Sequence, residues 1–137
     1  MFTISNKAKY ALATMVELAL SVKNKPVQAK LLSNQCQIPI KFLEHILSDL
    51  RQAGLILSQR GSKGGYCLAK TSDSIAIIDI ITVIDGPLSL SLGYCGGNIL
   101  NQWWKSVEVC LQDVLLVSLS ELVVKKQKEE KVINYAI

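Results

Sequence analysis

The chain of 137 residues contains a single histidine, His45, which excludes the H-E-x-x-H motif and histidine-rich zinc sites. It also lacks G-x-G-x-x-G, and the glycine cluster at residues 61–65 is not a Walker A loop because no G-K-[ST] follows it. His45 lies beside Glu44, but adjacent helical residues do not share a face, so acid–base catalysis is not expected from this pair. These absences predict that the chain is not an enzyme.

Cysteines are few, and long apolar runs are missing. The cysteines are too scattered for the disulfide framework of a secreted domain, and they stand at positions 36, 67, 95 and 110. Glu17 and Asp79 interrupt the apolar runs, so none reaches the roughly 20 residues of a membrane span. Residues 1–13 contain no apolar core of a signal peptide. We therefore expect a cytoplasmic protein with no membrane partner.

The charge is unevenly divided along the chain, whose net charge is +4. Residues 1–70 hold ten Lys or Arg against three Asp or Glu, whereas residues 71–137 hold five against eight. A basic N-terminal half is typical of a face that binds a polyanion. Lysines that solvate a small domain would give the same balance, so the charge alone does not decide between the two. The hydrophobic content of 50% indicates a folded chain.

Residues 39–69 contain the most informative pattern. Pro39 suits a first helical turn, and Gly54 suits the left-handed cap of a helix over residues 39–53. The apolar face of this helix is expected at Phe42, Leu43, Ile46, Leu47 and Leu50. A strand at 55–57, a glycine turn at 61–65 and a strand at 66–69 then form a hairpin, or wing, over residues 55–69. A helix followed by a basic-tipped hairpin is typical of a winged helix-turn-helix, whose helix enters a DNA major groove.

Two helices are expected before residue 39. The first starts at a Ser5 cap, ends at about Val22 and has a face of Leu12, Met15, Val16 and Ala19. The second covers residues 27–35 with Leu31 and Leu32 facing inward. A turn at 36–38 joins it to the next helix, as in a helix-turn-helix, and Cys36 is expected to be a small buried packing residue.

Residues 71–137 are predicted to contain a long helix. Residues 75–85 have helical spacing at Ile77, Ile78, Ile81 and Ile84, although their β-branched side chains leave a strand as an alternative. Gly86-Pro87 ends this element, and residues 88–98 form a loop. The helix at 99–117 carries an apolar stripe and a second apolar face, which predicts a partner helix; the stripe is Leu100, Trp103, Val107, Cys110, Leu111 and Val114, and the second face is Trp104, Leu115 and Leu116. A short last helix, capped by Ser118 or Ser120, and a solvated charged run at 125–131 follow.

Three motifs resemble the signature of the Rrf2 family of bacterial transcription regulators, which includes the IscR, NsrR and CymR types. They are Phe42-Leu43-Glu44, Leu50-Arg51-x-Ala53-Gly54-Leu55 and Arg60-Gly61-x-x-Gly64-Gly65-Tyr66-x-Leu68-Ala69. The similarity extends through most of the chain and weakens after residue 88. It implies a mainly α fold with a small β-hairpin, in which a winged helix-turn-helix is joined to a long dimerisation helix. The implied units are a DNA-binding domain at 1–86 and a loop, dimerisation helix and tail at 87–137.

The resemblance also implies a DNA-binding surface. The start of the first helix approaches the DNA backbone, Arg60 enters the minor groove, and Glu44 accepts a hydrogen bond from cytosine. Pairing of Glu44 with Lys41, or exposure to solvent, remains the alternative. Pro39, Phe42 and His45 replace the usual serine, tyrosine and glutamine, which should change the preferred bases without changing the docking. The implied DNA-binding residues are Lys7, Lys9, Tyr10, Gln28, Lys41, Phe42, Glu44, His45, Arg60, Ser62, Lys63, Gly64, Gly65 and Tyr66.

Many members of this family hold an iron–sulfur cluster on three closely spaced cysteines in the loop before the long helix. Here the loop contains only Cys95, and a cluster needs four ligands. Cys95 is therefore a candidate for a cluster with other ligand types or for a thiol switch, beside the alternative of plain structural cysteines. Residues 132–137 resemble the tail of the CymR type, which has no cluster.

The sequence as a whole predicts a homodimeric repressor that binds a palindromic DNA operator through helix 39–53 and wing 55–69. One alternative is an iron–sulfur or thiol redox-sensing regulator of the same family. Another is an interaction module that holds a partner enzyme. An effector enzyme or a small molecule is a further expected partner.

Overall fold

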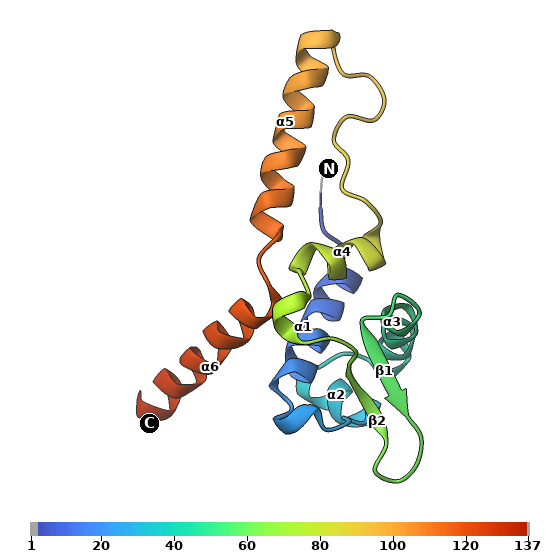
Figure 1. Cartoon of the computed structure of the whole chain (residues 1–137), viewed down its shortest axis with the longest axis vertical. Helices are drawn as coiled ribbons and strands as arrows, with labels where there is room; N and C mark the ends of the chain where they lie inside the picture. The colour runs from blue at the N-terminus through green and yellow to red at the C-terminus, as the bar shows by residue number, and fades with distance from the viewer. Residues whose placement is uncertain (1–2, 137) are drawn as a thin grey trace.

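The computed structural model describes residues 3–136, with side chains up to residue 133. Within this part of the chain, helices α1 to α4 and a two-stranded hairpin form a body, from which α5 and α6 project in different directions (Figure 1). The helices are α1 (Asn6–Leu20), α2 (Ala29–Cys36), α3 (Ile40–Gln52), α4 (Ile77–Asp85), α5 (Asn98–Leu115) and α6 (Leu119–Ala136). The strands are β1 (Ile56–Gln59) and β2 (Gly65–Leu68).

Helix α1 is the centre of the core. The Ser5 hydroxyl accepts a hydrogen bond from the Ala8 N–H at 3.0 Å, which confirms the predicted cap. Ala11, Met15 and Leu18 are fully or almost fully buried against the other helices of the body. The helix ends at Leu20, slightly earlier than expected, because the chain continues into a short 3₁₀ turn at Val22–Asn24.

Helices α2 and α3 form the predicted helix-turn-helix. Gln37 adopts a left-handed conformation in the turn between them, and the Ser33 hydroxyl donates to the Ile38 carbonyl at 2.5 Å. Pro39 is the N-cap residue of α3 rather than part of its first turn, and its carbonyl accepts the Leu43 N–H at 3.0 Å. The buried stripe of α3 consists of Leu43, Ile46, Leu47 and Leu50.

Two expected core positions are wrong. Leu31 is 49% exposed whereas its neighbour Leu32 is fully buried, because the short α2 buries only a narrow stripe. Phe42 is 54% exposed and is not part of the core face of α3. Its ring instead meets the edge of the Tyr10 ring, with the centroids 6.5 Å apart. In both cases the residue next to a buried leucine is rotated out of the core by the helical turn.

The hairpin lies beside α3. Ile56 pairs with Leu68 and Gln59 pairs with Gly65 in an antiparallel register. Compared with the expected strands, β1 starts at Ile56 instead of Leu55, and β2 spans 65–68 instead of 66–69. Gly54 follows Ala53, the C-cap residue of α3, and has a φ of +79°, as the predicted left-handed cap requires.

Helix α4 decides the helix-or-strand question for residues 75–85 in favour of helix. Ile77 and Ile80 are buried, whereas Ile78, Ile81 and Ile84 are half-buried. Just before α4, the chain pairs with the connection between α5 and α6. The Ile77 N–H donates to the Val117 carbonyl at 2.9 Å, and the Leu119 N–H donates to the Ile75 carbonyl at 2.8 Å. These two bonds attach the base of α5 to the body.

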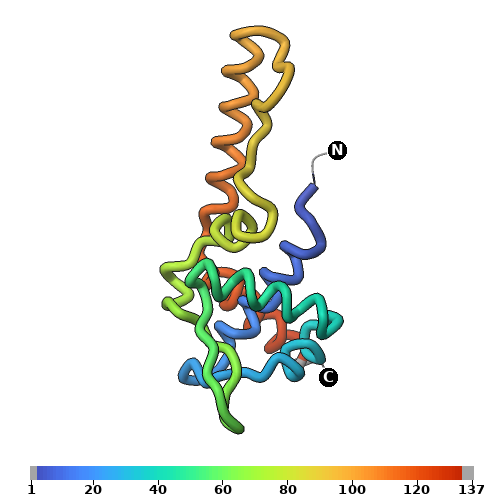
Figure 2. Tube along the Cα trace, turned by 90° about the vertical axis from the view of Figure 1, so that its right-hand side faces the viewer, coloured from blue at the N-terminus to red at the C-terminus, as the bar shows by residue number. Residues whose placement is uncertain are grey.

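Helix α5, all of whose residues are described, projects from the body and contains no buried residue. Figure 2 shows it standing clear, with the loop after α4 running back along it. Of the predicted dimerisation residues, Leu100, Trp103 and Val114 are exposed, whereas Val107 and Leu111 are half-buried. The Trp103 and Trp104 rings meet edge to face at 4.8 Å.

Helix α6 was expected to be short, but it has 18 residues. Its first turns are stabilised by the body, because Leu119 and Val123 are buried in the core formed by α1 to α4. Lys126 forms an ion pair with Glu17 of α1, and this hydrogen bond raises the pKa of Lys126. The expected solvated run at 125–131 is therefore helical, with Lys126 held against α1.

Two further expectations concern the C-terminus and membranes. The tail at 132–137 is helical up to residue 136, but the side chains of residues 134–136 and all of residue 137 lie outside the described part. Among the described helices, none combines the length and apolar character needed to cross a membrane.

Candidate nucleic-acid interface

Four of the predicted DNA-binding residues are exposed on α3, away from its buried stripe. Lys41, Phe42, Glu44 and His45 are all exposed, and the buried leucine and isoleucine stripe holds the opposite face against α1. Within the described residues, neither ion pair involves Glu44, so its pairing with Lys41 is not observed. The carboxylate is therefore free to meet a ligand.

The start of α1 borders this face through Tyr10, whose half-buried ring contacts Phe42. Lys9 is exposed next to it. The ammonium of Lys7, another predicted DNA contact, binds the Asp49 carboxylate of α3 at 2.8 Å. Lys7 thus links α1 to α3, and Lys9 is the unpaired lysine at this end of the helix within the described residues.

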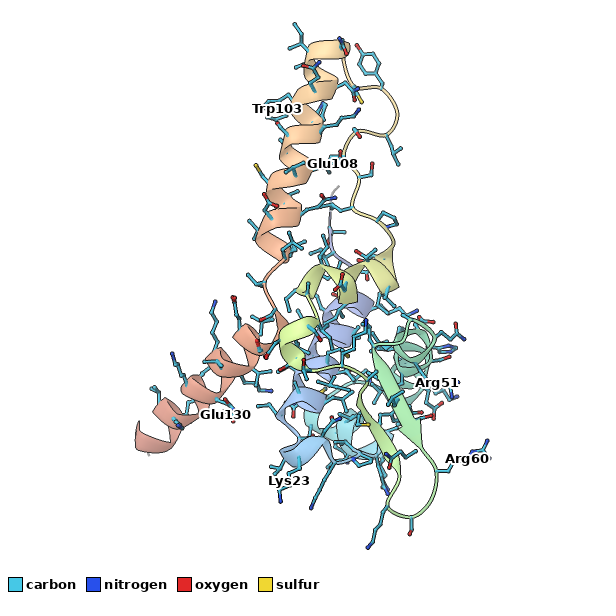
Figure 3. The ribbon with its side chains drawn as sticks, in the orientation of Figure 1. Lys23, Arg51, Arg60, Trp103, Glu108 and Glu130 are labelled. Atoms are coloured by element: carbon cyan, nitrogen blue, oxygen red, sulfur yellow. The ribbon has the colours of Figure 1, made fainter. Side chains whose placement is uncertain are left out.

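The wing presents cations from a turn that requires glycine. A Cβ atom on Gly64 would lie 2.2 Å from the Gln59 carbonyl oxygen, so any side chain there would push the two strands apart. Arg60, Ser62 and Lys63 are exposed around this turn. Figure 3 shows Arg60 pointing away from the body, with Arg51 of α3 above it on the same side. The tip can therefore approach a polyanion beside α3.

The wing is attached to the segment before α2. The Tyr66 N–H donates to the Val27 carbonyl at 2.9 Å, and the Val27 N–H donates to the Tyr66 carbonyl at 2.8 Å. A Cβ on Gly65 would lie 2.5 Å from the Val27 oxygen, which explains the glycine at this point. The Gln28 amide, an expected DNA contact, donates to the Ser62 carbonyl at 3.4 Å and so supports the wing tip.

Sequence reasoning missed Asn24, whose side chain binds the backbone of Leu68 in β2. A local signal existed, since an asparagine in the loop between α1 and α2 tolerates the left-handed backbone observed there, with φ of +52°. Its partner in the hairpin could not be found from that signal.

The cysteines lie on separate elements of the chain. Cys36 ends α2, Cys67 is buried in β2, Cys110 is exposed on α5, and the Cys95 thiol donates to the Ser91 carbonyl at 3.2 Å in the loop. Burial, reinforced by the Glu17 carboxylate, raises the pKa of the Cys36 thiol. Among the described residues, no three His, Cys, Asp or Glu side chains are grouped to hold a metal ion. The donors of one chain therefore do not fit an iron–sulfur cluster, which needs four ligands.

The sequence that contains α3 and the wing matches a known family of proteins. A family model described as "Iron-dependent Transcriptional regulator", Rrf2, matches residues 4–125. The chain belongs to the Rrf2 family. This confirms the resemblance on which the predicted site was based.

Curated relatives in the Rrf2 family carry the names of transcriptional regulators and not of enzymes, as predicted. The regulator CymR of Bacillus subtilis is 41% identical over 86 residues, which cover 63% of this chain and 62% of CymR. IscR of Erwinia tasmaniensis is 36% identical over 118 residues, covering 86% of this chain and 68% of IscR. A putative rrf2-like regulator of Rhodobacter capsulatus is 40% identical over 89 residues, covering 63% of this chain and 59% of the relative. The chain thus spans about three fifths of the CymR and rrf2-like sequences.

Solved structures of Rrf2 proteins confirm the predicted fold. CymR of B. subtilis superimposes with a TM-score of 0.83 at 32% identity, covering 91% of this chain and 98% of CymR. IscR of T. potens superimposes with a TM-score of 0.76 at 30% identity, covering 95% of this chain and 90% of IscR. The mainly α architecture with its small hairpin is therefore that of Rrf2 regulators.

Proposed function

We propose that the chain is a homodimeric, DNA-binding transcription repressor whose α3 enters the major groove while the wing reaches the adjacent backbone or minor groove. The observation that carries this proposal is the exposed face of α3 beside a fixed wing with exposed cations. Lys41 and Arg51 on α3, and Arg60 and Lys63 on the wing, supply the positive charge that a DNA backbone attracts.

Helix α5 supports a dimer. Trp103 is 54% exposed and Val114 is 69% exposed, so an apolar stripe of α5 lies in water in a single copy. A second copy of α5 would bury this stripe and bring two α3 helices onto two half-sites of one duplex. Because such a dimer has two-fold symmetry, its operator is palindromic. We accordingly assign DNA binding to residues 1–86 and pairing to residues 87–137, with the start of α6 anchored in the DNA-binding body.

The repressor role needs no surface other than the DNA-binding surface and the apolar stripe of α5. A dimer that occupies both half-sites of an operator within a promoter blocks access of the polymerase by its own bulk. The relatives named as CymR, IscR and rrf2-like regulators support a role in transcription, but their signals and targets belong to those proteins.

The test begins with selection of bound sequences from a random duplex library. We expect one enriched palindrome, tighter binding to it than to an isolated half-site, and a linear fall of log affinity with log salt concentration. Transcription in vitro from a promoter carrying the palindrome should decrease as protein is added. A scrambled duplex of equal composition is the control. Absence of enrichment, or equal affinity for the scrambled duplex, would contradict the proposal.

A further inference from the structure

The outer edge of β2 is paired along its length by the segment before α2. Tyr66 exchanges two backbone hydrogen bonds with Val27, at 2.8 and 2.9 Å. At Leu68, the next residue that faces this edge, the partner is the Asn24 side chain. The Leu68 N–H donates to Asn24 Oδ1 at 3.2 Å, and Asn24 Nδ2 donates to the Leu68 carbonyl at 3.1 Å.

Asn24 thus replaces a peptide group. Alternate residues of a strand direct their backbone groups to the same edge, so Tyr66 and Leu68 need partners on the same side. A primary amide offers one acceptor and two donors, which match the N–H and C=O of one residue. Asn24 therefore continues, with its side chain, the ladder that Val27 begins with its backbone.

The loop that carries Asn24 is itself tied to α1. Asn24 has a left-handed backbone, and its N–H donates to the Ser21 carbonyl at 3.2 Å. Ser21 is the residue directly after α1, the helix at the centre of the core. A continuous set of hydrogen bonds therefore runs from the end of α1, through Asn24, to the base of the wing.

The other strand of the wing, β1, follows α3 after a glycine cap. Among the described residues, no backbone hydrogen bonds are formed at the edge of β1 that faces away from β2. Core packing of Ile56 and Leu68 holds the base of the hairpin, and the hydrogen bonds at Val27 and Asn24 hold its outer edge. We infer that Asn24 is a positioning residue for the wing, holding β2 so that Arg60 and Lys63 meet DNA at a fixed place relative to α3. This inference rests on the proposed function.

A positioning role differs from a merely structural one in its coupling to Arg60. If Asn24 acts by fixing the position of the wing, removing its side chain also removes most of the contribution of Arg60 to DNA affinity. If Asn24 only stabilises the fold, the effects of the two substitutions on DNA affinity are independent and add.

The experiment measures affinity for the selected palindrome at several salt concentrations for Asn24→Ala, Arg60→Ala and the double variant. We expect about a fivefold loss for Asn24→Ala, the size of effect that ordering one segment has. Its salt dependence should be shallower than that of wild type, and Arg60→Ala should add little to it. Additive losses, or wild-type affinity for Asn24→Ala, would overturn the inference.

Three variants serve as controls. Asn34→Ala removes an exposed asparagine of α2 and should bind like wild type. Asn24→Gly removes the side-chain amide but still allows the left-handed backbone. Its loss of DNA affinity should equal that of Asn24→Ala, which would exclude backbone strain as the cause of the loss. If Asn24→Ala fails to fold, Asn24→Asp, which keeps the acceptor for the Leu68 N–H but loses the donor, is carried through the same cycle.

Amide hydrogen exchange separates this inference from the proposed function. Asn24→Ala should speed exchange at the Leu68 N–H about tenfold, relative to the Tyr66 N–H, which Val27 still binds. Unchanged exchange at Leu68 would disprove the anchor, whether or not the protein binds DNA. Failure of the wild-type protein to bind any duplex, with exchange at Leu68 accelerated as expected, would contradict only the proposed function.

Discussion

Glu44 is exposed on the side of α3 that we propose faces DNA and has no ionic partner among the described residues, so its substitution tests base reading directly. Sequence selection with Glu44→Ala should lose its preference at one position per half-site, with about 1–3 kcal/mol less discrimination there. Total affinity should not fall, because a negative charge near phosphates has been removed. Glu121→Ala, an exposed site on α6, is the matched control. Selected sequences identical to those of wild type would show that Glu44 is not a reader.

Arg60 tests the wing in the same assay. Arg60→Ala should weaken operator binding and reduce the salt slope by about one, since one phosphate-region contact is lost. Arg60→Lys should restore only part of the affinity, because a lysine lacks the planar fork of the guanidinium. Lys128→Ala removes an exposed cation from α6 and should leave both quantities unchanged. An unaltered salt slope for Arg60→Ala would show that Arg60 of the wing does not contact the DNA.

Cys36 gives a pH-dependent prediction. Burial and the Glu17 carboxylate raise the pKa of this thiol, so it stays protonated at a pH where exposed thiols begin to ionise. Because the thiolate is the nucleophile, alkylation of Cys36 should be slow near neutral pH and should accelerate only above the ordinary thiol range. Mass spectrometry after timed alkylation measures this, with the same thiol in urea-unfolded protein as the comparison. Equal alkylation rates of Cys36 in the folded and the unfolded protein would contradict the prediction.

At the residue scale, local signals were predictable and distant partners were not. The Ser5 cap and the Gly54 turn depend on a few neighbouring residues, and both were found from the sequence. Asn24 and Leu68 are 44 positions apart, and Lys7 and Asp49 are 42 apart. No periodicity along the chain links residues at such separations, so the engagement of Lys7 and the role of Asn24 needed the fold.

At the element scale, helices with a clear apolar stripe were predicted almost to their ends, including α3 and α5. The length of α6 was missed, because its charged half has no apolar period to extend the pattern. Packing of Leu119 and Val123 on the core, and the Lys126–Glu17 pair, fix its first turns, from which the helix continues. Tertiary contacts thus decided the length of the element whose own sequence pattern was weakest.

Helix α5 carries the prediction of a dimer. Replacing Val107 and Leu111 with glutamate places two charges in the apolar stripe, so pairing of two copies should be lost. Sedimentation should then show a monomer, and operator binding should be weak because the two half-sites are no longer bound together. Val124→Glu with Gln127→Glu adds the same charge on α6 and should remain dimeric. An unchanged dimer in the α5 variant would place the interface elsewhere.

At the scale of the whole molecule, the distribution of cysteines argues against a cluster within one chain. The thiols of Cys36, Cys67 and Cys110 lie on three different elements, away from the loop that holds Cys95. Protein purified without oxygen should therefore show no visible absorption band of an iron–sulfur cluster, and Cys95→Ser should bind the operator like wild type. A visible band that Cys95→Ser abolishes would contradict this and would require ligands from a second copy.

The loop and α5 leave the body and return to it at one place. Gly86 and Leu88, where the loop begins, line the same cavity as Leu115, where α5 ends. A segment whose two ends lie close together can be lengthened, shortened or exchanged without moving the body to which both ends attach. The reason is that the entropic cost of closing a loop rises slowly with its length. We therefore expect that this junction is where an engineer could replace the loop and α5 with a different segment.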